Sequence, residues 1–388
     1  MNLDLHLTTA CNMKCSFCGA WEFGKSQAYI SYDEAVAALD AGKKEGYRIT
    51  TLTGGEPTLN SDYEKILRYA HSIGYWTVVT TNGLFLTDEM IHTYKNCKTL
   101  VRVSLHTLNA PLHKEITGEN TLHTVLQNIQ RLRENGVRLG IGCTIYDKNI
   151  DELHSLASFA WKSNAAFIRY TPVVGIRGAD SIKLEYSFFR DLLGRIAEIC
   201  VNNSSLLEQK SYNSNYAKQI VDYMTTRRCA GGSKQHIIYD CHGTVLPCSF
   251  IPEEMKLCCE SENTPIRERF KKVNENMSVF FSDAFTENLM GECGKCIHKK
   301  SCRGGCLTMK LPLGLPPDGE QPICIHHIIS EIYNSYEKES MRKLINYWCS
   351  CFLQKAGAAD RDKVCIRRLP IWELNFRYTA GREKYDFK

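Results

Sequence analysis

The chain has 388 residues, a formal net charge of +5 and 43% hydrophobic residues, which is the composition of a soluble globular protein with room for two domains. Its charges are nearly balanced and form no long run of one sign, so neither a nucleic acid nor a membrane is expected as a partner. No stretch has the apolar length of a membrane span and no signal peptide opens the chain, so a cytoplasmic protein is expected.

The 19 cysteines are unusual for such a chain. The cytosol keeps thiols reduced, so metal ligation explains them better than disulfides do. They gather near the N-terminus and from Cys229 onward. Cys97, Cys143 and Cys200 stand alone and are expected to be small buried hydrophobic residues.

Over residues 3–170, short β-branched runs alternate with amphipathic segments, which predicts repeated β-α units and a parallel sheet. Strands are predicted at residues 3–8, 49–52, 76–80, 100–105, 138–145 and 167–174. Helices are predicted near residues 32–45, 63–73, 122–134 and 153–161, and another after Thr87. Ser31, with Glu34 three residues later, is a capping-box signature.

Two loops in this half carry unusual residues. Cys11, Cys15 and Cys18 follow the first predicted strand in a C-x3-C-x2-C pattern, and the Gly-Gly-Glu-Pro sequence of residues 54–57 follows the second. Three thiolates in eight residues can hold three corners of an iron-sulfur cube and leave the fourth open, although zinc and Cu(I) are also soft-ligand metals. Loops at the carboxyl ends of parallel strands usually carry the chemistry, so both loops are expected on one face.

Together these motifs resemble the radical S-adenosylmethionine (SAM) superfamily, whose fold is a partial (β/α)6 TIM-like barrel of the α/β class. The resemblance implies a 4Fe-4S cluster on the three cysteines, with SAM chelated at the open iron and cleaved reductively to a 5′-deoxyadenosyl radical. It also implies an electron donor such as flavodoxin or ferredoxin. The implied cofactor-binding residues are Phe17 beside the adenine, Gly54, Gly55, Glu56 and Pro57 at the methionine amino group, and Ser104 at the ribose and carboxylate. Asn82, Thr144 and Arg169 are further candidates to line the cavity.

A second cysteine set lies beyond a predicted helix over residues 184–207 and a linker over residues 208–228. Its spacing is C-x13-G-x4-C, then C-x2-C-x5-C-x3-C, then a last cysteine. This region is poor in apolar residues and has long loops, so metal binding is expected to supply much of its folding free energy. A zinc site is the alternative on the residues alone.

With the N-terminal motifs, this run resembles the SPASM domain, which holds two auxiliary 4Fe-4S clusters and would bring the total to three. The resemblance implies an outer cluster on Cys293, Cys296, Cys302 and Cys324, and an inner one on Cys229, Cys248 and Cys306. The inner cluster's fourth ligand is unassigned: Cys241 is the first candidate, followed by Cys258, Cys259 or a position open to substrate. The predicted domains are residues 1–207, 229–330 and a C-terminal helix and tail over 331–388.

The predicted function is net oxidative modification, such as a crosslink, of a ribosomally synthesised precursor peptide by a radical SAM/SPASM oxidoreductase. Ser249 stands where the resembling sulfatase-activating enzymes carry an aspartate base, which argues against that activity. The first strand begins almost at the N-terminus, so a separate peptide-recognition protein is a candidate partner. The alternatives are a dehydrogenase or epimerase of a small molecule such as an aminosugar, and a non-catalytic metal-cluster scaffold. The sequence assigns no general base.

Overall fold

The structure is a computed structural model that describes residues 1–18, 27–173, 185–202, 235–249, 264–296, 299–310, 313–324, 327–328, 331 and 374–377. The predicted linker, Cys229, Cys258 and Cys259 lie outside these residues, as does nearly all of the predicted C-terminal helix and tail.

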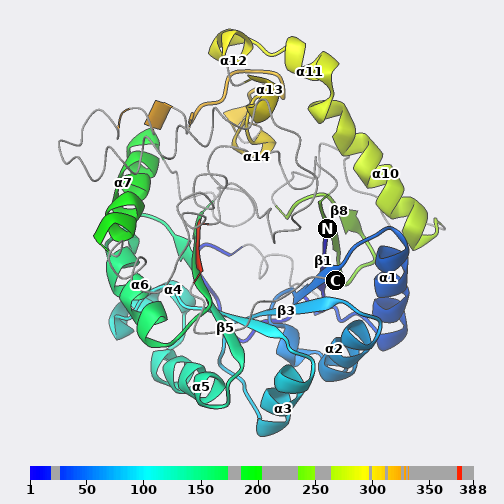
Figure 1. Cartoon of the computed structure of the whole chain (residues 1–388), viewed down its shortest axis with the longest axis vertical. Coiled ribbons are helices and arrows are strands. Elements are labelled where there is room, and N and C mark those ends of the chain that lie inside the picture. Colours follow the sequence, from blue (N-terminus) through cyan, green and yellow to red (C-terminus); the bar gives the residue numbers. More distant parts are fainter. Residues whose placement is uncertain are drawn as a thin grey trace.

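The sheet follows the predicted order of strands. Neighbouring strands pair in parallel along the series β1 (Asn2–His6), β2 (Ile49–Thr53), β3 (Trp76–Thr81), β4 (Leu100–Ser104), β5 (Arg138–Ile145) and β6 (Phe167–Pro172). Figure 1 shows the sheet curved around an interior, with helices outside it. The predicted α/β class and partial barrel are therefore confirmed.

Three further strands extend this sheet at its edges and were not predicted. Strand β7 (His236–Tyr239) pairs in parallel with β1, and β8 (Val245–Leu246) pairs antiparallel with β7. At the other edge β9 (Leu374–Arg377) pairs antiparallel with β6. Runs of two to four residues carry little periodicity, so only the partner strand identifies them.

The outer helices match the predicted segments. They are α1 (Tyr32–Lys44), α2 (Tyr63–Ser72), α3 (Asp88–Asn96), α5 (Leu122–Glu134), α6 (Leu153–Lys162) and α7 (Tyr186–Asn202). The hydroxyl groups of Ser31 and Thr87 accept the backbone N–H groups of Glu34 and Met90, so both predicted N-caps are confirmed. Alternate strand residues such as Leu3 and Leu5 are fully buried in the core between sheet and helices.

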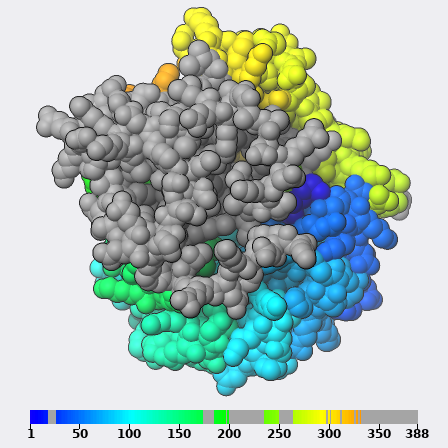
Figure 2. Space-filling view, in the orientation of Figure 1, coloured from blue at the N-terminus to red at the C-terminus, as the bar shows by residue number. Residues whose placement is uncertain are grey.

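Helices α4 (Ala110–Thr117) and α10 (Ile266–Ser278) were not predicted. Helix α10 packs on α1 (Figures 1 and 2), where the rings of Tyr47 and Phe270 meet edge to face with centroids 6.0 Å apart. The remaining described elements are short: η2 (Pro57–Leu59), η3 (Ile150–Glu152), η5 (Val279–Phe281), α11 (Asp283–Glu287), α12 (Gly291–Lys295), α13 (Lys299–Cys302) and α14 (Leu307–Lys310).

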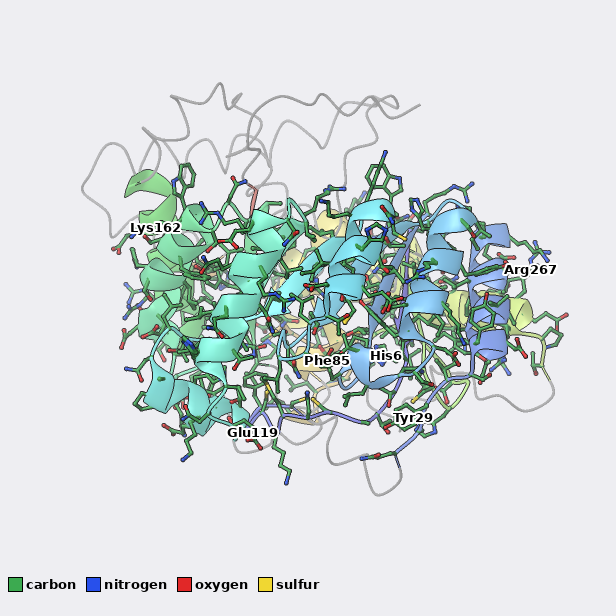
Figure 3. The ribbon with its side chains drawn as sticks, turned by 90° about the horizontal axis from the view of Figure 1, so that it is seen from below. His6, Tyr29, Phe85, Glu119, Lys162 and Arg267 are labelled. Atoms are coloured by element: carbon green, nitrogen blue, oxygen red, sulfur yellow. The ribbon has the colours of Figure 1, made fainter. Side chains whose placement is uncertain are left out.

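The two edges of the barrel differ in their loops. Figure 3 shows Tyr29, Phe85 and Glu119 along one edge and Lys162 along the opposite edge. The first three follow β1, β3 and α4, so this edge is formed at the carboxyl ends of the strands. No helix in the described ranges combines the length and apolar character needed to span a bilayer.

Candidate functional site

The N-terminal cysteine loop is held by backbone hydrogen bonds on both sides. Gly55 N–H donates to Thr8 O at 2.7 Å, and Glu56 N–H donates to Ala10 O at 2.8 Å. Farther along, Lys14 N–H and Ser16 N–H donate to Thr117 O and Ile116 O, at the C-terminal end of α4. The loop therefore lies between the residue 54–57 loop and α4, on the face where both motifs were expected.

Gly54 and Gly55 are required by this close approach of two backbones. Gly54 has φ +131, and a Cβ there would lie 2.5 Å from Thr8 O. At Gly55 a Cβ would overlap Ala10 O. Any larger residue would push the cysteine loop away from β2, so these glycines fix the position of the thiols whatever they contact in a ligand.

Glu56 is buried, and it ties this loop to the end of β3. Its Oε1 accepts the hydroxyl groups of Thr58 and Thr81 at 2.7 and 2.8 Å, and its Oε2 accepts Asn82 N–H at 2.8 Å. Burial raises the pKa of Glu56, and these hydrogen bonds oppose that rise. The described contacts of Glu56 are with protein groups, and its place at the cofactor stays a prediction. Pro57 begins η2 directly after it.

The thiols of Cys11, Cys15 and Cys18 lie within electrostatic reach of one another. Burial and then the charges of Cys18 and Cys11 raise the pKa of Cys15 to about 12. Burial raises the pKa of Cys11, while hydrogen bonds from the Met13 backbone and the Asn82 side chain lower it. Three crowded thiolates need a cationic centre to offset their charge, and a ligated iron cluster provides one. The donor set fits the implied cluster.

Phe17 packs between two aromatic rings that the sequence analysis missed. Its ring meets those of His106 and Tyr146 edge to face, with centroids 4.9 and 5.8 Å away. His106 Nδ1 accepts Thr144 N–H at 3.1 Å, so the proton of the neutral ring lies on Nε2. Burial and then the charge of His113 lower the pKa of His106 to about 3, which keeps the ring neutral. The signal for His106 was its position two residues after Ser104, the last residue of the fourth strand.

The barrel interior is polar. His236 Nε2 lies 2.9 Å from Asp4 Oδ2, joining β7 to β1, and Arg102 donates to Thr80 Oγ1 at 2.6 Å. Burial raises the pKa of Asp4, but the charge of His236 and then those of His6 and Arg102 lower it to about 2. Ser104 and Arg169 pair with Gly142 from either side in the strand register. These charged and polar groups could bind a polar substrate.

The four predicted outer-cluster cysteines lie within electrostatic reach of one another. The pKa of Cys302 is raised to about 12, first by burial and then by the charges of Cys324, Cys293 and Cys296. This donor set also needs a cationic centre and fits a cluster. No three Cys, His, Asp or Glu side chains within the described ranges are close enough to hold one metal ion. A mononuclear site needs every sulfur about 2.3 Å from one metal, whereas the thiolates of a four-iron cluster bind separate irons.

Three of the inner-cluster candidates, Cys241, Cys248 and Cys306, lie within the described residues. Cys306 Sγ lies 3.0 Å from Thr308 Oγ1, and Cys248 packs beside the buried pair Met277 and Leu307. The pKa of Cys241 is raised to about 11, first by burial and then by the charge of Asp240. A hydrogen bond with the Thr9 backbone opposes this rise. Cys241 thus neighbours the N-terminal cysteine loop, and its role as fourth ligand stays a prediction.

Residues 5–160 match the sequence profile of the Radical SAM superfamily. A probable GTP 3′,8-cyclase of Sulfurisphaera tokodaii is 35% identical over 161 residues, which are 41% of this chain and 51% of that protein. The chain thus spans about half the length of that relative.

Two relatives align over most of both chains. The AdoMet-dependent heme synthase of Methanosarcina barkeri is 26% identical over 82% of this chain and 95% of its own. The mycofactocin maturase MftC of Mycolicibacterium smegmatis is 23% identical over 83% of this chain and 82% of its own. Among solved structures, Streptococcus suis SuiB bound to the precursor peptide SuiA is similar in fold, with a TM-score of 0.64, 16% identity, and coverage of 82% of this chain and 74% of that one.

Proposed function

Residues 5–160 form a radical SAM domain, and from that premise we propose that this enzyme oxidatively modifies a ribosomally synthesised peptide. Two auxiliary clusters in the second cysteine region would accept the electron released by the substrate. The observation that carries the proposal is the alignment with a maturase over 83% of the chain, which is far more than the radical SAM domain alone. The shared fold with a precursor-peptide complex agrees with a peptide substrate.

When bound, SAM and its 4Fe-4S cluster supply a 5′-deoxyadenosyl radical that abstracts a hydrogen atom from substrate. Cys11, Cys15 and Cys18 would hold that cluster, and Gly54 and Gly55 fix their loop. Phe17 and His106 would form one wall beside the adenine, with His106 neutral and its Nε2–H available as a donor. The interior with Asp4, His236 and Arg102 would receive the polar backbone of a peptide.

The first experiment measures 5′-deoxyadenosine. The anaerobically reconstituted protein, with dithionite and SAM, should form it, and the Cys11→Ala/Cys15→Ala/Cys18→Ala variant should not, although it keeps its auxiliary iron. Iron near twelve atoms per chain is expected for three four-iron clusters. Full iron loading without any 5′-deoxyadenosine would leave the non-catalytic scaffold as the correct function.

The second candidate substrate is a small molecule, because the heme synthase relative aligns over 95% of its own length. The neighbouring genes separate the candidates. A short reading frame for a precursor peptide should lie beside the gene, and that peptide should lose mass in units of hydrogen when incubated with the enzyme, SAM and reductant. An unchanged peptide mass, together with turnover of a small molecule, would decide for the second candidate.

A further inference from the structure

Lys310 is a fully buried cation at the end of α14. Its side chain has 0% exposed surface, and Nζ donates to Pro317 O at 2.9 Å. Among the described carboxylates none forms an ion pair with it, although the charge of Asp318 acts on it. An ammonium group loses its favourable hydration when it is buried, and only nearby negative groups can offset that loss. The charge of Lys310 therefore needs partners beyond one carbonyl oxygen.

The cysteine loop leaves space for this ammonium group by using glycine. Gly304 and Gly305 lie between Cys302 and Cys306 with φ +77 and +81. A Cβ on Gly304 would lie 2.6 Å from Leu289 Cδ2 and 3.1 Å from Lys310 Nζ. The Nζ group thus lies directly against the backbone that joins the last outer-cluster cysteine of the loop to an inner-cluster cysteine.

A second polar side chain, that of the half-buried Gln321, lies against the same loop. A Cβ on Gly305 would overlap the Gln321 amide, whose Nε2 lies 3.5 Å from Met309 Sδ, next to Lys310. Gln321 N–H also donates to Cys293 Sγ at 3.3 Å. Lys310 and Gln321 therefore form a polar layer that reaches the Cys293 thiol through this hydrogen bond on one side and the loop before Cys306 on the other.

The negative groups around Nζ belong to both cysteine sets. Burial lowers the pKa of Lys310, while Cys293 and Cys302, then Asp318 and Cys306, raise it. Cys293 and Cys302 are in the outer set and Cys306 is in the inner one. Lysine is a compact point charge, so one ammonium group can act on several thiolates at once.

We propose that the Lys310 ammonium group is a counter-charge shared by the two auxiliary clusters, a positioning residue that makes both easier to reduce. This inference rests on the proposed function, because it needs both clusters. A cluster gains negative charge when it takes up an electron, and a nearby cation in a dry site stabilises that reduced form. Lys310 would thereby help both clusters to accept electrons from substrate.

The test is redox titration of the fully loaded protein, followed by electron paramagnetic resonance. Lys310→Met should shift the reduced-to-oxidised ratio of both auxiliary clusters at least tenfold toward the oxidised form, which is about 59 mV for a one-electron couple. The SAM-binding cluster should not shift. Lys299→Met is the matched control, since that lysine lies in the same region but is paired with Glu287 at the surface; it should shift none of the clusters. Lys310→Arg should keep both potentials near those of the wild type.

Unchanged auxiliary potentials in loaded Lys310→Met protein, or a shift in one cluster alone, would overturn the proposal. If Lys310→Met loses auxiliary iron, the comparison moves to iron retention. If Lys310→Arg retains the auxiliary iron while Lys310→Met and Lys310→Gln lose it, the site requires the positive charge. Equal loss of iron by all three variants would overturn the proposal. Wild-type protein without two auxiliary cluster signals would contradict the proposed function instead, and this is measured before any variant.

Discussion

Asn82 connects three parts of the N-terminal site through single hydrogen bonds. Its backbone N–H donates to Glu56, and its Nδ2 lies 2.6 Å from Asn12 Oδ1. Its side chain also forms a hydrogen bond with the Cys11 thiol. Hydrogen bonds to a ligating sulfur tune an iron-sulfur cluster. The sequence suggested Asn82 only as a residue lining the cavity, while the structure places it against the thiol of Cys11, a predicted cluster ligand.

Replacing this amide should slow the chemistry without removing the metal. Asn82→Ala is expected to lower the initial rate of 5′-deoxyadenosine formation about 10–100-fold with iron content unchanged, because the backbone bond to Glu56 remains. Asn135→Ala, which removes an exposed amide bonded to Arg131 O at the end of α5, should leave the rate unchanged. An Asn82→Ala rate equal to that of the wild type would show that the Cys11 contact has no influence.

The Asp4 and His236 pair should make stability depend on pH. Burial lowers the pKa of His236, but the charge of Asp4, its hydrogen bond to the ring and a hydrogen bond with the Pro247 backbone together raise it above the ordinary value. The stabilisation from His236 is therefore complete below about pH 6.5 and is lost as pH rises through the higher folded value. The pKa of Asp4 is lowered to about 2, so the stabilisation that Asp4 contributes is present above the ordinary pKa of an aspartate and is lost as pH falls toward about 2.

His236→Gln should therefore destabilise the protein by about 3 kcal/mol near pH 5 and by less near pH 8. Thermal unfolding at the two pH values measures the difference. His92→Gln, at an exposed histidine of α3, should show no such dependence. A loss of stability in His236→Gln that is the same at both pH values would mean that packing, not charge, holds β7 to β1.

At the scale of elements, the register between the cysteine loop and the loop after β2 depends on Gly54. Gly54→Ala would place a methyl group 2.5 Å from Thr8 O at φ +131, so the loop must move. The expected result is loss of about four irons per chain and of SAM binding, measured by iron analysis and equilibrium dialysis. Gly136→Ala is the matched control: its φ is +68 and nothing lies within 4 Å of the added Cβ. Gly136→Ala should lower the stability of the fold by about 1–2 kcal/mol and should retain all iron. An equal loss of iron in the Gly54→Ala and Gly136→Ala proteins would refute the steric argument.

At the scale of the molecule, the two cysteine regions should lose their metal independently. Cys302→Ser is expected to remove about four irons while 5′-deoxyadenosine still forms, because its thiol neighbours are Cys293, Cys296 and Cys324. Cys97→Ser, at a buried cysteine on the outside of the sheet, should retain all iron. Loss of 5′-deoxyadenosine in Cys302→Ser would show that the regions depend on each other.

Much of this molecule could be predicted from local pattern. The strands β1–β6, the outer helices and the caps at Ser31 and Thr87 agree with the sequence because periodicity and capping are local properties. The cysteine and glycine motifs also predicted which loops meet at one face, since parallel strands place their carboxyl ends together.

Only the tertiary structure decided which distant side chains meet inside that frame. Strand β7 joins the sheet beside β1 across more than 200 residues, and Asp4 meets His236 there. Phe17 lies between His106 and Tyr146, and Lys310 lies against Gly304. Such contacts depend on how strands and loops close in space, and no spacing along the chain encodes them. The sequence by itself determined the fold class and predicted the cluster ligands, while folding determined which charges, rings and amides surround those cysteines.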